Sequence, residues 1–189
     1  MDPKTSAAPA KSARERLLAA TALFYEEGIN TVGIDRIIER AGVAKASLYD
    51  VFGSKEELVR AYLAQRDAAR RARLEAGLER YKTPRDKILG VFEVIGEIFK
   101  QAGFRGCAFM RASAECKVNT APRAVCDDAR AWTLDLFTRL AKEAGIPQPK
   151  KLAQRLVILY DGATVAAALD GDPHAAATAK AMAAALIAA

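Results

Sequence analysis

The sequence is poor in the side chains that most enzymes use for acid–base and metal chemistry. Its 189 residues include one histidine, His174, and three cysteines. A single histidine leaves little for general-base, metal or Ser-His-Asp chemistry, and no glycine-rich phosphate loop is present. Cys107, Cys116 and Cys126 are an odd number without a close pair, so neither a disulfide framework nor a zinc ligand set is indicated. We expect no enzyme, no cofactor and no metal.

Long apolar runs are also missing. No uninterrupted apolar stretch approaches the roughly 20 residues that a membrane span needs. The first residues, MDPKTSAAPAKSAR, lack the apolar segment of a signal peptide. We therefore expect a cytoplasmic protein with reduced thiols and no membrane partner.

Charge does not locate a binding surface. The net charge is +6, and residues 1–60 hold nine Lys or Arg and nine Asp or Glu, so the whole surplus lies downstream. A surplus of this size permits binding to nucleic acid without showing where it would occur.

The apolar residues recur every three or four positions almost throughout, and no alternating stretch is long enough for a convincing strand. The pattern predicts an all-α fold. Ser12 and Ser54 are suitable N-caps, and Gly28 and Gly42 are suitable stops. About nine helices are expected, over residues 12–26, 34–41, 45–51, 55–81, 84–101, 107–117, 122–144, 149–170 and 173–188.

Short helices come early in the chain and long ones later, which predicts a small head on a larger helical body. We expect a flexible tail at residues 1–11, a three-helix head at 12–62 and a body at 63–189. The boundary then falls inside the helix predicted for 55–81.

The most informative segment is residues 34–55, IDRIIERAGVAKASLYDVFGSK. Two short helices are joined by a tight turn around Gly42, as in a helix-turn-helix pair. Core spacing is found for Ile37, Ala41, Val43, Leu48 and Phe52. The residues left for the opposite side are Lys45, Ala46, Ser47, Tyr49 and Asp50. A short exposed helix of this kind suits the major groove of DNA, where base edges can be read.

Residues from about 12 to 62 resemble the tetracycline-repressor (TetR-like) family of bacterial transcriptional regulators. The resemblance covers about a quarter of the chain by motif, and the body matches only in length and helical rhythm. The matching residues are Phe24, Gly28, Ile37, Ala41, Gly42, Val43, Lys45, Ser47, Leu48, Tyr49, Phe52, Lys55, Glu56 and Leu58.

The resemblance implies a role for individual residues of the head. Lys45, Ala46 and Ser47 would lie at base edges of double-stranded operator DNA. Tyr49 and Lys55 would each contact a phosphate, and Arg36 is a further candidate for phosphate contact. Solvation or packing is the alternative for each of these residues.

Three positions depart from the family pattern. Ala44 stands where a capping Ser or Thr is common, and Ala46 where glycine is frequent. Asp50 would repel phosphate, so it either accepts a hydrogen bond from cytosine or points away from the duplex.

The resemblance also implies a homodimer and a small-molecule effector bound in the body. Aromatic and sulfur side chains gather in a few neighbouring helices there and are candidate pocket walls, although each could equally belong to the core: Phe92, Phe99, Phe109, Met110, Trp132, Phe137 and Tyr160. The last two helices are the expected dimer interface, with these candidate contacts: Leu152, Leu156, Leu159, Ala163, Ala167, Leu186 and Ile187.

Cys107 is a candidate sensor of oxidants or electrophiles. It follows Arg105 and Gly106 at a predicted helix start, where the helix dipole and the nearby Arg105 and Arg111 would lower its pKa. A buried, unreactive thiol is the alternative.

These observations predict a DNA-binding transcriptional regulator, a repressor that a small molecule releases from its operator. Two alternatives remain open. One is a constitutive DNA-binding dimer without an effector, and the other is a helical small-molecule binding protein without DNA function.

Overall fold

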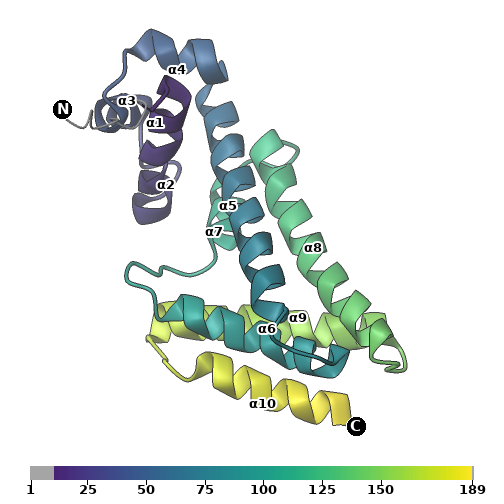
Figure 1. The fold of residues 1–189 in the computed structure, drawn as a ribbon. Coiled ribbons are helices and arrows are strands. Elements are labelled where there is room, and N and C mark those ends of the chain that lie inside the picture. Colours follow the sequence, from purple (N-terminus) through teal and green to yellow (C-terminus); the bar gives the residue numbers. More distant parts are fainter. Residues whose placement is uncertain (1–10, 189) are drawn as a thin grey trace, which may run out of the picture. The chain divides into compact units, whose positions relative to one another are not determined.

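The structure is a computed structural model that describes residues 11–188, so the predicted tail lies outside the described residues except for Lys11. The described chain folds into helices with no strand among them, which confirms the all-α prediction (Figure 1). In chain order the elements are α1 (Ala13–Ala20), α2 (Ala22–Glu27), α3 (Ile34–Ala41), α4 (Lys45–Phe52), α5 (Lys55–Leu78), α6 (Pro84–Phe99), α7 (Ala108–Glu115), α8 (Ala121–Glu143), α9 (Pro149–Val165), the π-helix η1 (Ala166–Asp170) and α10 (Ala175–Ala188).

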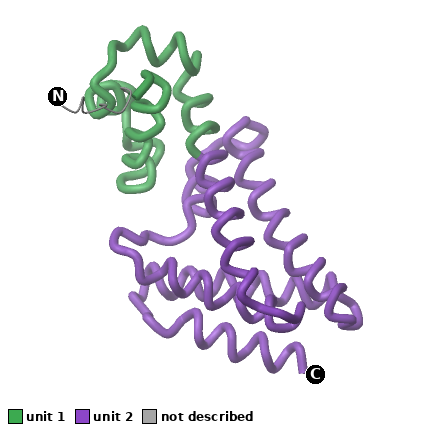
Figure 2. The backbone as a smooth tube through the Cα atoms, in the orientation of Figure 1, with its two compact units in different colours: residues 1–62 green, residues 63–189 purple. Residues whose placement is uncertain are grey.

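The chain divides into two compact units, residues 1–62 and 63–189, and the division falls within α5 (Figure 2). In the first unit, the head, α1 packs against α3 and α4. Leu17, Ile37 and Leu48 are completely buried between these helices. This small apolar core fixes the positions of α3 and α4 relative to α1.

The helix starts in the head follow the predicted caps. Ser12 forms a capping box with Glu15, and the Ser54 hydroxyl accepts a hydrogen bond of 3.1 Å from the Glu57 amide. The predicted helix at 12–26 is wrong at one point, because it breaks at Thr21 into α1 and α2. The Thr21 hydroxyl donates to the Leu18 carbonyl, a local bond that competes with regular helix.

The second unit, the body, has a core built from five long helices. The α8 helix packs along α9, and α10 packs against α6 and α9. Phe92, Phe137 and Leu156 are completely buried among them. The end of α5 joins the same core through Leu74 and Leu78.

The predicted helix at 149–170 is α-helical only as far as Val165 and ends in the π-helix η1. Residues 149–170 contain an 18-residue window of mean hydropathy 1.3, long and apolar enough to cross a membrane by length and composition. This window tolerates up to two charged residues, so it differs from the uninterrupted apolar run that the sequence analysis did not find. One third of the window is buried, and a core helix of a globular body has the same properties.

Candidate nucleic-acid interface and ligand cavity

The turn between α3 and α4 is held by hydrogen bonds on both sides. Gly42 has a φ of 61°, in the left-handed region that favours glycine. The amides of Gly42 and Val43 donate to carbonyls of the last turn of α3, at 3.1 and 3.2 Å. Arg16 of α1 donates to the Gly42 carbonyl. The turn therefore has one conformation, which presents α4 at the surface of the head.

The predicted reading residues share the exposed face of α4. Lys45, Ala46, Tyr49 and Asp50 are exposed and Ser47 is half-buried. Leu48 faces inward and is completely buried, as the spacing predicted. Contact of these residues with bases or phosphates stays a prediction.

Two cationic side chains of the head, Lys45 and Arg36, form ion pairs with carboxylates. The Lys45 ammonium lies 3.1 Å from a carboxylate oxygen of Asp35, and this hydrogen bond raises the pKa of Lys45. Arg36 forms a two-pronged pair with Glu27, one of whose bonds is 2.9 Å. Both Lys45 and Asp35 are mostly exposed, so their ion pair contributes little to stability.

Lys55 has contacts within the head, and its phosphate contact stays a prediction. Its ammonium donates to the Ile29 carbonyl at 2.7 Å and lies over the ring of Phe24. These contacts tie the start of α5 to the loop after α2. The resemblance placed Lys55 correctly at a helix start, but the sequence could not reveal a carbonyl 26 positions away.

The body has a cavity of about 310 Å³, partly open to solvent, between α5, α7, α8 and α9. Three of the predicted pocket residues line it, namely Phe109, Met110 and Tyr160. The other four do not line this cavity: Phe92 and Phe137 are fully buried in the core, Phe99 packs against that core, and Trp132 lies against arginine side chains. An aromatic-rich sequence does not distinguish a core position from a cavity wall.

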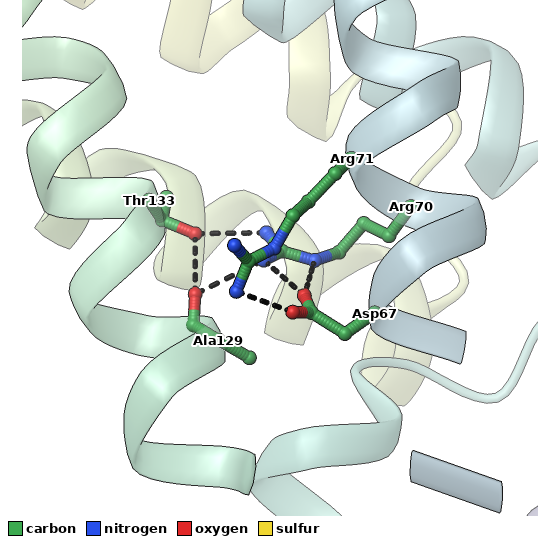
Figure 3. A network of polar contacts seen from close by, with 5 residues as sticks. All are labelled: Asp67, Arg70, Arg71, Ala129 and Thr133. Carbon is green, nitrogen blue, oxygen red and sulfur yellow. Dashed lines mark hydrogen bonds and ion pairs between the residues drawn. The ribbon is translucent and has the colours of Figure 1, made fainter. Parts of the chain in front are cut away.

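A polar network beside the cavity joins α5 to α8, and sequence reasoning missed it (Figure 3). Arg70 donates to Asp67 at 2.7 Å, to the Thr133 hydroxyl at 2.8 Å and to the Ala129 carbonyl at 3.0 Å. Arg71 pairs with the second oxygen of Asp67. The spacing of the three α5 residues was visible in the sequence, but such a group is normally a solvated surface cluster. Here Asp67 is 7% exposed.

The arginines of this network also stack on aromatic rings. Arg70 lies over Phe109 at 5.4 Å and over Trp132 at 4.9 Å from the ring centres. Arg71 lies over Trp132 at 5.2 Å. The charge of Arg70 is thus held at one wall of the cavity by hydrogen bonds and cation–π contacts together.

Cys107 is the N-cap of α7 and lines the cavity. Its predicted pKa shift has the wrong direction, because burial raises the pKa of the thiol by more than the amides of α7 and the Arg70 charge lower it. A role for Cys107 as a sensor stays a prediction. Among residues 11–188, no three His, Cys, Asp or Glu side chains gather as a metal site would require.

The predicted dimer contacts on α9 need correction. Leu152, Leu156 and Ala163 are buried within the body itself. Leu159, Ala167, Leu186 and Ile187 are partly buried against the same core. In the last helices, the large exposed apolar residues are instead Ile158 and Val165 on α9, Leu169 on η1 and Met182 on α10. The helical period alone left the choice between the inner and outer faces of α9 open.

The comparisons with known proteins agree on one family. The sequence pattern of the bacterial regulatory proteins, tetR family, matches residues 17–62. The transcriptional repressor NemR of Escherichia coli K12 is 31% identical over 169 residues, which cover 82% of this chain and 83% of NemR.

Solved structures extend the similarity to the whole fold. A TetR-family regulator from Streptomyces coelicolor superposes with a TM-score of 0.85 at 36% identity, over 93% of this chain and 94% of that one. The reduced form of Escherichia coli NemR superposes with a TM-score of 0.80 at 26% identity, over 90% and 94%. The chain belongs to the tetR family of bacterial regulatory proteins, and it is a DNA-binding transcriptional regulator.

Proposed function

We propose that this regulator is a homodimeric repressor, and that a small molecule bound in the body cavity releases it from its operator. NemR, which matches most of the chain, is named a repressor. Regulators of this family bind operator DNA, act as dimers and are not enzymes. Membership of the family removes the alternative of a binding protein without DNA function.

The observation that carries the effector role is the cavity of about 310 Å³ in the body. Its volume falls within the range of small-molecule sites in proteins. It is bordered by Arg70 of α5, the helix that begins at Lys55 in the head. A ligand that displaces Arg70 therefore acts on the helix that both units share. A coupling of about 1–3 kcal/mol would lower operator affinity roughly 5- to 150-fold.

The head residues that we propose for DNA contact are Lys45, Ala46, Ser47, Tyr49 and Asp50, with Arg36 flanking them. For Lys55 the contacts with Ile29 and Phe24 support a role in holding the head together.

A cavity-filling variant tests the effector role. Ser113 lines the cavity, whereas Ala114 is exposed on the same helix and does not. The wild-type chain first selects its DNA from a random duplex pool, and this DNA is labelled and bound to each protein. A panel of small acids, amines and neutral compounds is then added, and release of the DNA is followed by fluorescence anisotropy. We expect Ser113→Trp to bind DNA but resist release, and Ala114→Trp to behave as wild type. Release of both variants at the wild-type dose would contradict the proposal, and a panel without any active compound would favour the constitutive alternative.

A further inference from the structure

The charged side chains around the cavity do not balance. Arg70, Arg123, Arg130, Asp127 and Asp161 line it, and behind the lining Asp67 pairs with both Arg70 and Arg71, which gives four arginines and three aspartates in all. Arg123 pairs with Asp127 at 2.9 Å and Arg130 pairs with Asp161 at 2.7 Å, so these charges are matched at the cavity rim. Arg70 and Arg71 share a single carboxylate, that of Asp67.

This cluster of Asp67, Arg70 and Arg71 is partly withdrawn from water, although the Arg71 side chain is 33% exposed. The side chains of Asp67 and Arg70 are only 10% and 15% exposed. Of these two arginines, Arg70 lines the cavity. Charges withdrawn from water are normally paired, so a group that supplies one negative charge would complete this cluster.

The polar groups at this wall are donors. The Nη1 atom of Arg70 carries two N–H groups, and one of them donates to Thr133. Arg70 also donates a hydrogen bond to the Tyr160 hydroxyl, and this bond and the Arg70 charge both act to lower the pKa of Tyr160. Burial has the larger effect and raises the pKa of Tyr160, so the hydroxyl keeps its proton near neutral pH. The N–H groups of Arg70 are thus engaged with Asp67, Ala129, Thr133 and Tyr160, and the Tyr160 hydroxyl, which accepts from Arg70, still has a proton to donate to a ligand.

The remaining wall is apolar and the space is small. The cavity is also bordered by the apolar side chains of Phe109, Met110 and Val157. Its volume of about 310 Å³ is at the small end for ligand sites. The occupant therefore has a compact apolar body.

We propose that the cavity binds a compact monocarboxylate with an apolar body, and that Arg70 and Tyr160 receive its carboxylate. The inference rests on the proposed effector role of the same cavity and names the chemical class of its ligand. A carboxylate can accept the Tyr160 proton beside Arg70, and it supplies one negative charge to the cluster of Asp67, Arg70 and Arg71.

The full-length chain contains a direct reporter, because Trp132 is its single tryptophan and lies against Arg70. The probes are benzoate, benzamide and benzylammonium, which carry the same ring with a negative, zero or positive charge. We expect benzoate to change the Trp132 fluorescence saturably and to bind at least about tenfold more tightly than benzamide. Benzylammonium should give no saturable change.

Two variants and a control assign the effect to the proposed residues. Arg70→Met keeps the length of the side chain and should reduce the preference for benzoate over benzamide to about threefold or less. Tyr160→Phe keeps the ring and should weaken benzoate about 3- to 10-fold, which guards against misfolding of the Arg70 variant. Arg139→Met removes an exposed arginine of α8 outside the cavity and should bind benzoate like wild type.

Equal binding of benzamide, tighter binding of benzylammonium, or no saturable binding of any probe would overturn the proposal. So would an unchanged preference in Arg70→Met. Failure of the proposed effector role has a different outcome: benzoate would bind but would leave the operator complex intact. If another compound releases DNA while benzoate does not bind, the effector role stands and the carboxylate assignment falls.

Discussion

Ala44 of the head occupies a helix N-cap position, for which alanine is poorly suited. It is the N-cap of α4, with φ and ψ of −70° and 152°, and it gives the first amides of the helix no side-chain acceptor. Serine adopts the same backbone conformation and supplies the missing oxygen.

Ala44→Ser should therefore stabilise α4. The expected gain is about 1 kcal/mol, which corresponds to roughly fivefold slower exchange of the α4 amides in hydrogen-exchange measurements. Ala46→Ser, two positions further on in the first turn, is the matched control and should give no gain. Equal effects of the two substitutions would argue against the capping explanation.

Cys107 illustrates how burial can reverse an expectation drawn from neighbouring charges. The amides of α7 and the Arg70 charge do favour the thiolate, but loss of solvent has the larger effect and raises the pKa of the thiol above its ordinary value. A raised pKa means that the reactive thiolate is scarce at neutral pH and accumulates only above the pKa of a free cysteine.

We expect Cys107 to react slowly with iodoacetamide at pH 7, compared with a free thiol, and its rate to keep rising beyond pH 9. The measurement is peptide mass spectrometry of the modified site as a function of pH. A rate that levels off below pH 8 would show a lowered pKa instead and would restore the original expectation. If Cys107 is a sensor, Cys107→Ser should also raise the dose of electrophile that releases DNA.

Among the helices, the exposed side of α9 and η1 differs most from the dimer interface that the sequence predicted. Ile158 of α9 is 69% and Leu169 of η1 is 79% exposed, and the exposed Gly162 and Val165 lie between them in the sequence. The spacing of four and three residues from Ile158 to Val165 follows the α-helical period, and the exposed apolar surface continues on η1 at Leu169. Exposed apolar stripes of this kind mark interfaces with other proteins.

Substitutions on the two faces of α9 should separate dimerisation from folding. Leu169→Asp should give a monomer with unchanged helix content, because it places a charge in the proposed interface. Leu156→Ala should lower the free energy of unfolding by about 2–5 kcal/mol, because Leu156 is completely buried in the body. Analytical ultracentrifugation and urea unfolding distinguish the two effects. A dimeric Leu169→Asp protein at micromolar concentration would exclude this face as the interface.

The elements that could be predicted from sequence are those fixed by local chemistry. The turn at Gly42, the capping box of Ser12 and the buried side of α4 follow from residues within a few positions of one another. The break at Thr21 and the π-helix at Ala166–Asp170 were missed, because the local pattern there is compatible with a regular α-helix. The Asp67, Arg70 and Arg71 network depends on Ala129 and Thr133, about 60 positions away, and no local pattern reports such a contact.

For the whole molecule, dimerisation and DNA binding are expected to depend on each other. Dimeric readers place two recognition helices about 34 Å apart, or a multiple of that distance, on successive half-sites. A monomeric Leu169→Asp chain should therefore lose about 100-fold or more in operator affinity while keeping an intact head. Wild-type affinity of this monomer would mean that one head suffices.

The central claim is that the exposed face of α4 reads the operator, and the operator affinity of Lys45→Ala tests it most directly. DNA selected by the wild-type chain is titrated at one fixed salt concentration, with Lys142→Ala, an exposed lysine of α8, as the matched control. The account predicts that Lys45→Ala weakens binding by about 1–3 kcal/mol, roughly 5- to 150-fold, while Lys142→Ala changes it little. An unchanged affinity of a folded Lys45→Ala protein would contradict the account.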